Sequence, residues 1–215
     1  VGSEMCIRDR YLLGIDKDPV IDDPEIAQFW DGLPKNLSKL ENVIWAENPA
    51  NVDDYAWTKG SDGISRVWHP GIQEGKNYGW AGAPDIVAEY KGQIVLGDLK
   101  TSNNPYCSKW PDSSTPKSEY GKKRSGFMKY QKCQLQLAAY ALGLEHTINI
   151  IPDLCMTFVA TKEGSQVFVI QKHTIEKYKQ KWLDIVTKYY EEVLPSKKKA
   201  VVEMEGIDGD NIDPK

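Results

Sequence analysis

Two runs of apolar and β-favouring residues, at 84–90 and 93–101, lie on either side of a Lys-Gly dipeptide and predict a β-hairpin with a two-residue turn. Residues that pair directly across such a hairpin carry their side chains on the same face. Counting outward from the turn places Asp85 opposite Asp98, whereas a longer loop would shift this register. Lys100 lies two residues beyond Asp98 and therefore projects from the same face.

Further apolar patterns and turn signals predict the other elements. Expected before the hairpin are a short helix at 23–32 capped by Asp23, a strand at 40–47, and an irregular or β-rich segment at 48–79. Expected after it are a polar loop at 102–125, a helix from about Phe127 to Leu142 ended by Gly143, strands at 154–161 and 165–172 around a Glu163-Gly164 turn, and a last helix capped by Thr174 and ended by Pro195. This order predicts an α/β fold with a mixed central sheet flanked by helices.

The length and composition fit one globular domain. The chain has 215 residues, of which 40% are hydrophobic and 10% aromatic, enough for a sizeable core. We expect residues 11–195 to form this domain, residues 1–10 to be a non-native segment resembling translated adaptor sequence, and the charged tail at 196–215 to be disordered. No stretch is apolar and long enough for a secretion signal or a membrane span, so no membrane partner is expected.

The four cysteines, Cys6, Cys107, Cys133 and Cys155, are widely spaced and include no C-x-x-C pair. A disulfide framework is therefore not expected at this length and spacing. Reduced, partly buried thiols fit a cytoplasmic protein.

The net negative charge of the chain disfavours nucleic-acid binding, but the basic residues are concentrated in one segment, which favours it. The chain carries −4, from 27 basic and 31 acidic residues, whereas nucleic-acid-binding proteins are usually basic. Acidic residues gather in the C-terminal tail, and the segment 117–132 is strongly basic. Basic loops are often simply solvated, but this one lies between the predicted hairpin and the next helix, where it can reach phosphates. The candidate residues are Lys122, Lys123, Arg124 and Lys129, with Phe127 and Tyr130 as less favoured base-stacking residues.

The predicted hairpin brings two carboxylates and an ammonium group together. Asp85 and Asp98 would repel one another unless a cation neutralised them, and divalent cations prefer oxygen ligands. Asp and Lys on one strand face also fit an exposed surface with a weak ion pair. A site is favoured because Asp is depleted in strands and because the flanking residues are apolar, where a lone charge would be costly. With Lys100 beside them, the carboxylates suit hydrolysis of a phosphodiester.

Other kinds of site are disfavoured by the sequence. The lone His69, between Trp68 and Pro70, fits a structural or exposed position better than a metal ligand. The few histidines have no adjacent partner for a Ser or Cys nucleophile, so no catalytic triad is indicated. The chain has no glycine-rich P-loop, and motor activity is therefore not expected.

Three motifs give this chain a family resemblance. They are Trp80-Ala81-Gly82-Ala83-Pro84-Asp85, Gly97-Asp98-Leu99-Lys100-Thr101-Ser102 and Gln136-Leu137-Ala138-Ala139-Tyr140-Ala141. The first two contain the signature of the PD-(D/E)XK nuclease superfamily, and all three resemble the motifs G-x-x-D, D-x-K-T and Q-L-x-x-Y-A of its RecB-type exonuclease branch. Their order and spacing are similar to those of the mitochondrial genome maintenance exonuclease and its phage relatives, over roughly residues 38 to 192.

The resemblance implies a restriction-endonuclease-like core and a metal-dependent reaction. It implies that Asp85 and Asp98 bind Mg²⁺ or Mn²⁺, with the backbone carbonyl of Leu99 as a further ligand. Lys100 would orient or help deprotonate the attacking water and stabilise the charge that develops on the phosphate.

The resemblance also assigns roles to neighbouring residues. Gln136 and Tyr140, four residues apart on one helix face, would position the substrate or the active-site strand. Without the motif, they fit a solvated helix position and a core aromatic. The remaining candidates are Thr101 and Ser102 as nucleic-acid contacts, and Glu47 or Glu41 as an additional acidic ligand on the preceding strand.

The chain departs from the family pattern in two places. A His that is often found on an N-terminal helix is missing, since none precedes Tyr11, so we expect the first helix, and a metal ligand with it, to be lost. The late cysteine cluster that holds an iron–sulfur cluster in some RecB-type nucleases is also missing, so no such cluster is expected.

Three functions remain open from the sequence. The first, implied by the resemblance, is a metal-dependent DNA exonuclease acting on single-stranded or free-ended DNA in the cytoplasm, encoded by a phage or a bacterial host. The residues themselves do not distinguish DNA from RNA. The second is an endonuclease on the same core, and the third is a non-catalytic nucleic-acid-binding module whose site is incomplete.

Overall fold

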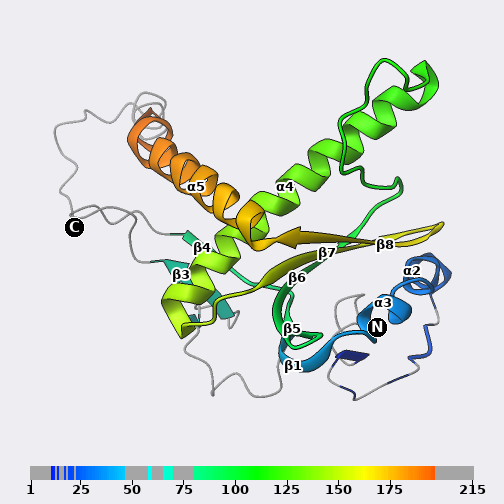
Figure 1. The fold of residues 1–215 in the computed structure, drawn as a ribbon, viewed down its shortest axis with the longest axis horizontal. Coiled ribbons are helices and arrows are strands. Elements are labelled where there is room, and N and C mark those ends of the chain that lie inside the picture. The colour runs from blue at the N-terminus through cyan, green and yellow to red at the C-terminus, as the bar shows by residue number, and fades with distance from the viewer. Residues whose placement is uncertain are drawn as a thin grey trace, which may run out of the picture.

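The computed structural model is an α/β arrangement in which a five-stranded mixed sheet carries helices on both faces (Figure 1). The structure describes residues 11–12, 14, 17, 19–21, 23–46, 58–59, 65–69 and 80–196. Within these ranges, no helix has the length and apolar character needed to cross a membrane.

The elements follow one another in an order close to the expected one. The N-terminal part contains α2 (Pro24–Trp30), α3 (Pro34–Leu37), β1 (Glu41–Ala46), β2 (Thr58–Lys59), β3 (Ser65–His69) and β4 (Trp80–Gly82). The rest contains β5 (Ile86–Tyr90), β6 (Gln93–Thr101), α4 (Lys117–Ile148), β7 (Leu154–Thr161), β8 (Gly164–Gln171), α5 (Lys172–Lys188) and the π-helix η2 (Tyr189–Val193).

The main sheet has the strand order β1-β5-β6-β7-β8. All its neighbours are antiparallel except β6 and β7, which are parallel. Parallel neighbours need a crossover connection, and α4 provides it by crossing one face of the sheet. Strands β2, β3 and β4 form a second, three-stranded sheet that packs against α4.

The central strands of the main sheet have a core cluster on each face, and successive residues of a strand point into one cluster and then the other. On the α4 face, Leu96 packs in one core cluster with Leu137 and Leu144. On the other face, Val95 packs in a second cluster with Leu37 of α3. All eight residues of β7 are buried, as expected for an inner strand covered on two sides.

The predicted hairpin is confirmed in both turn and register. Lys91 and Gly92 have φ of 52° and 73°, the positive values that a type I′ turn requires at both central residues. The ladder that follows pairs Ala88 with Val95 and continues to Ile86 and Gly97, as counting from the turn predicts. The predicted cap of the first helix is also confirmed, because the side chain of Asp23 accepts a hydrogen bond from the Glu25 amide.

The expected bounds of the central helix are wrong at both ends. Helix α4 begins at Lys117, so the basic segment expected in a loop is helical, and it ends at Ile148 with a left-handed Asn149 as its cap. The loop at 102–125 is expected from its polar residues and from Pro105, Pro111 and Pro116, and the end at Leu142 is expected from Gly143. All three prolines lie before the helix that forms, and Gly143 inside it costs about 1 kcal/mol, which is small beside the burial of Leu144 in the core.

Three finer predictions about the C-terminal part are also wrong. The turn between β7 and β8 lies at Lys162 and Glu163, because Gly164 already pairs with Thr161. Helix α5 follows β8 without a break, so Thr174 lies inside it and caps nothing.

Pro195 lies within the last helical turn and does not end the helix. A π-helix precedes it, in which the Leu194 amide bonds to the carbonyl of Tyr189. A proline cannot donate the regular helix bond and clashes with the carbonyl four residues earlier, and widening the preceding turn relieves that clash.

Replacing either of two glycines of α4 by alanine is expected to change the stability of the protein, in opposite directions. A Cβ added at Gly126 would lie 2.6 Å from the carbonyl oxygen of Pro105, whereas one added at Gly121 would meet nothing within 4 Å. We expect Gly121→Ala to stabilise the protein by up to about 1 kcal/mol through helix propensity. We expect Gly126→Ala to destabilise it by about 1–3 kcal/mol, because backbone must move. Urea unfolding of both variants checks this, and equal shifts would contradict it.

Candidate active site

The site begins where pairing between β5 and β6 ends. The last ladder pair is Ile86 with Gly97, and Asp85 comes directly before it. The Oδ2 atom of Asp85 accepts a hydrogen bond from the backbone N–H of Leu99 at 2.7 Å. This carboxylate therefore lies beside β6 at the level of residues 98 and 99, as the hairpin register predicted.

Asp98 and Lys100 share the face of β6 that α4 covers. Leu96 lies in the core cluster of α4, and alternation along the strand puts Asp98 and Lys100 on the same side. Asp98 is fully buried, and its Oδ1 atom accepts a hydrogen bond from Lys100 Nζ at 2.8 Å. The Lys100 side chain keeps 29% of its surface exposed, so the pair connects the interior to the surface.

The two carboxylates determine the charge state of Lys100. Burial alone would lower the pKa of this lysine, but the hydrogen-bonded Asp98 and the charge of Asp85 outweigh it, so the pKa is raised above its ordinary value. The side chain is therefore an ammonium group at neutral pH, able to donate hydrogen bonds and to neutralise negative charge.

Gln136 and Tyr140 are joined on α4 next to this group. The amide nitrogen of Gln136 donates a hydrogen bond to the hydroxyl of Tyr140 at 2.7 Å. Burial is the main cause that raises the pKa of Tyr140, the hydrogen bond from Gln136 opposes it, and the charges of Asp98 and Asp85 raise it further. The phenol is therefore neutral, and the structure brings this predicted pair to the predicted site.

Gly82 provides the space that Tyr140 occupies. A Cβ atom at Gly82 would collide with the ring of Tyr140, so only glycine allows β4 to approach α4 this closely. Trp80, at the other end of β4, donates a hydrogen bond from its indole nitrogen to the backbone carbonyl of Ala139 at 3.3 Å. The first and third motifs of the sequence are thus in direct contact.

A buried thiol also lines the site, but its chemistry is not that of a nucleophile. Cys133 packs against Tyr106 and Val159 beneath α4. Burial, and then the charge of Asp98, raise its pKa to about 11, so the thiol is neutral at physiological pH. Cys107 and Cys155 are free thiols as well, and Cys6 lies outside the described residues.

The predicted nucleic-acid contacts separate into two groups. Lys129 donates a hydrogen bond to the buried hydroxyl of Ser102 at 3.1 Å, just past the end of β6, where Thr101 is exposed. Lys122 is exposed and lies seven residues before Lys129, hence on the same side of α4. Gln136 follows after another seven residues, so this side of the helix leads to the candidate site.

Lys123 and Arg124 point elsewhere. Lys123 forms an ion pair with Glu119 at 3.0 Å, and the guanidinium of Arg124 lies over the ring of Trp110 at 5.8 Å. The two predicted stacking residues pack against protein rings, which favours a structural role for them. Phe127 contacts Trp110 and Tyr130 contacts Phe168, with ring centroids 5.4 and 4.8 Å apart.

The additional acidic ligand has no support among the described residues. Glu41 lies at the far end of β1, opposite Glu89, whereas Ala46 is the residue of β1 that pairs next to the site with Ile86. Glu41 is therefore too far along the strand to contribute, and Glu47 lies outside the described residues. Within the described ranges, no three or more His, Cys, Asp or Glu side chains gather as a metal site.

The donors that are present fit a hydrated Mg²⁺ ion. Asp85 and Asp98 supply two carboxylates, and Mg²⁺ is usually held by one or two carboxylates with several waters. The N–H and C=O of a strand residue point to the same side, so the Leu99 carbonyl is directed toward the side where Asp85 accepts from its N–H. Thr157, level with Asp98 on β7, has a buried hydroxyl without a hydrogen-bond partner among the described residues, which suits a polar occupant.

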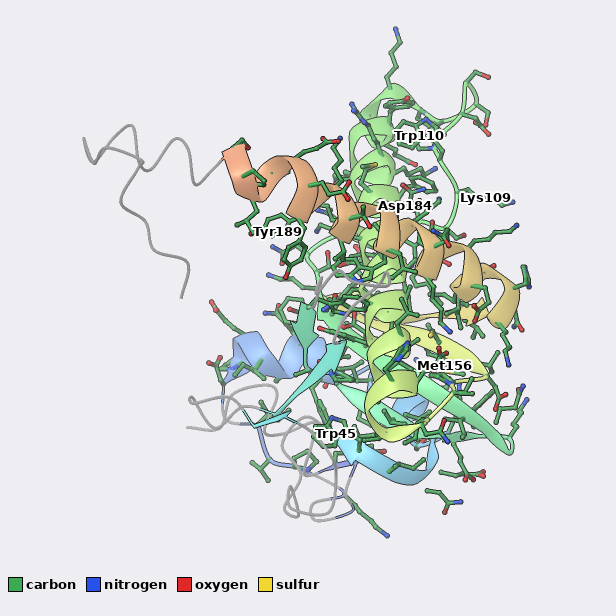
Figure 2. All side chains as sticks on the ribbon, turned by 90° about the vertical axis from the view of Figure 1, so that its left-hand side faces the viewer. Trp45, Lys109, Trp110, Met156, Asp184 and Tyr189 are labelled. Carbon is green, nitrogen blue, oxygen red and sulfur yellow. The ribbon has the colours of Figure 1, made fainter. Side chains whose placement is uncertain are left out.

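Sequence reasoning missed two residues that border the site. Lys132 and Trp182 line a pocket of about 340 Å³ that also contains Gln136 and Tyr140. Trp182 comes from α5, and no local pattern links it to a motif in β4 or α4. Only the crossing of α5 over α4 brings it there (Figure 2).

Comparison with protein-family models and with curated proteins gives no match for this chain. The geometry of the site and the motifs in the sequence are therefore the basis for a functional proposal.

Proposed function

We propose that this protein is a metal-dependent nuclease of the PD-(D/E)XK type that hydrolyses phosphodiester bonds, with single-stranded or free-ended DNA as the preferred substrate and exonucleolytic cleavage as the mode. The observation that carries the proposal is the meeting of Asp85, Asp98 and Lys100 at the point where the β5-β6 ladder ends. The five-stranded mixed sheet, crossed by α4 between β6 and β7, supports a restriction-endonuclease-like core for it.

Each residue of the candidate site has a separate role in the proposed hydrolysis. Asp85, Asp98 and the Leu99 carbonyl would hold Mg²⁺ or Mn²⁺, which when bound lowers the pKa of the attacking water and offsets phosphate charge. Lys100 keeps a positive charge beside the same carboxylates, where it stabilises negative charge that develops on the phosphate. Tyr140 and Gln136, as a neutral hydrogen-bonded pair, orient the substrate. Because the thiol of Cys133 is neutral and buried, direct attack by water is favoured over a covalent intermediate.

The side of α4 that carries Lys122 and Lys129 is the proposed path of the strand. The two residues are seven apart, about 10 Å along the helix, and the side they share leads to Gln136. Cations at this spacing follow a phosphate backbone without reading its sequence. Arg124, which covers Trp110, does not belong to this path.

We expect the path to give a measurable salt dependence. Each phosphate contact on a single strand adds about 0.7 to the slope of log K against log salt concentration. Lys122→Ala and Lys129→Ala should each reduce this slope by about 0.7 in anisotropy titrations of a labelled oligonucleotide. Lys188→Ala, which removes an exposed cation paired weakly with Glu192 on α5, is the control and should leave the slope unchanged.

A cleavage assay tests the proposed function directly. End-labelled linear and circular single strands are incubated with the protein and Mg²⁺, with Asp98→Ala and EDTA as controls. We expect the linear strand alone to be degraded, and only by the wild type with metal. Digestion of the circle would instead indicate an endonuclease. Binding without metal-dependent cleavage would indicate a binding module and would overturn the enzyme proposal.

A further inference from the structure

A pocket beside the candidate active site lies between three elements, and most of the residues that line it have no role in the proposed hydrolysis. It has a volume of about 340 Å³, and β4, α4 and α5 all contribute to it. The residues that line it are Trp80, Lys132, Leu135, Gln136, Ala139, Tyr140 and Trp182. Gln136 and Tyr140 belong to the candidate active site as well, so whatever fills this pocket lies next to the scissile phosphodiester.

The lining of the pocket fits a flat, largely apolar ring. Trp80 and Trp182 meet edge to face, with their ring centroids 5.9 Å apart and their planes at 76°. Leu135 and Ala139 add an apolar surface from α4. The indole nitrogen of Trp182 is buried and has no hydrogen-bond acceptor within the described part of the chain, so the side chain presents carbon atoms of its ring to the pocket.

The charge beside the pocket indicates that the ring belongs to a nucleotide. Lys132 is exposed and lies one helical turn before Gln136, so its ammonium group borders an otherwise apolar lining. An aromatic pocket next to a cation is how proteins hold single strands, with a base against the rings and a phosphate against the lysine. A buried apolar side chain of a protein partner would not need Lys132.

We propose that this pocket, here called the Trp182 pocket, binds a nucleobase of the substrate strand within one or two nucleotides of the bond that is cleaved. The inference rests on the proposed nuclease function and names the part of the substrate that the protein recognises. Stacking accepts every base, so the pocket selects for the presence of an unpaired base and not for its identity. It therefore disfavours paired DNA, in which the bases are stacked on one another.

Abasic substrates test this inference. A set of single strands, each with one abasic position, is measured with the wild type and with Trp182→Ala, for kcat/KM in Mg²⁺ and for Kd by anisotropy in metal-free buffer. We expect one position near the cleaved bond to lower both kcat/KM and affinity by about 5- to 100-fold in the wild type. Trp182→Ala should lose as much on the intact strand, and the abasic position should then add less than about twofold.

Two further variants separate the pocket from general damage. Trp182→Phe keeps an aromatic face and should recover most of the loss. Trp110→Ala removes another tryptophan, 46% exposed, which Figure 2 shows near the end of α4 that projects away from the sheet, and it should behave like the wild type. Circular dichroism and thermal melting verify that each variant is folded.

The outcomes distinguish the inference from the function on which it rests. A wild type that cleaves single strands but tolerates every abasic position overturns the pocket and leaves the nuclease. The inference is also overturned if the fold-loss from Trp182→Ala and the fold-loss from the abasic position multiply when the two changes are combined. Multiplication would show that the two changes act independently. A wild type that neither cleaves nor binds single strands overturns the proposed function itself.

Discussion

Lys100→Met is expected to lower the rate of Mg²⁺-dependent cleavage by at least about 100-fold. The Lys100 ammonium lies 2.8 Å from Asp98 and is the cation that the chain itself places beside the two carboxylates. Methionine has a similar length and no charge, so the variant removes the electrostatic contribution while filling the same space. Single-turnover cleavage of a labelled strand at saturating protein measures the effect on the chemical step separately from binding.

The same substitution is expected to weaken the fold for a separate reason. Asp98 is fully buried, and without Lys100 its charge would lose a hydrogen-bonded partner. Breaking a buried pair by removing one partner costs about 3–5 kcal/mol, and the partial exposure of Lys100 puts the expected loss at the lower end.

The double variant Asp98→Asn/Lys100→Met separates the two effects, because it removes both charges together. We expect its unfolding free energy in urea to return to within about 1 kcal/mol of the wild type, while cleavage stays absent. A double variant as unstable as Lys100→Met would show that the ion pair is not the cause. A Lys100→Met protein that cleaves at the wild-type rate would remove Lys100 from the mechanism.

The hairpin at the centre of the site is the part that sequence predicts best. Its turn needs positive φ at two positions, its strands are short and apolar, and the register follows once the turn is fixed. Each of these signals is local. For that reason Asp85, Asp98 and Lys100 could be placed together from the sequence, and the structure brings them together.

The parts that sequence predicts poorly depend on tertiary contacts. The polar, proline-containing segment at 102–125 and Gly143 predict a short α4, yet the packing of Gly126 against Pro105 and the burial of Leu144 allow it to run through both regions. Some basic residues of α4 face the site and others do not. Which of them do depends on where the helix begins and how its turns place each side chain. The Trp182 pocket depends on α5 crossing α4, which no pattern within either helix indicates.

Asp85→Asn is expected to abolish the response to metal without weakening the metal-free protein. An asparagine oxygen can still accept the hydrogen bond from Leu99, so the end of the hairpin keeps its contact. The change also removes one of two like charges that the register brings together. The free energy of unfolding of the metal-free variant should therefore lie within about 1 kcal/mol of the wild-type value. The metal site, in contrast, loses one of its two carboxylates.

Thermal melting in a Mg²⁺ series measures this independently of cleavage. A ligand at 100 times its Kd stabilises a protein by about 2.7 kcal/mol, which for a domain of this size raises Tm by about 5–10 °C. We expect that rise in the wild type and none in Asp85→Asn at the same concentrations, together with a cleavage rate at least about 100-fold lower. Asp153→Asn is a control, because that carboxylate accepts from the Ile94 amide at the opposite end of β6 and should leave the metal response intact. An unchanged melting shift in Asp85→Asn would place the metal elsewhere, because a divalent ion held by Asp98 alone would bind far more weakly than one shared by two carboxylates.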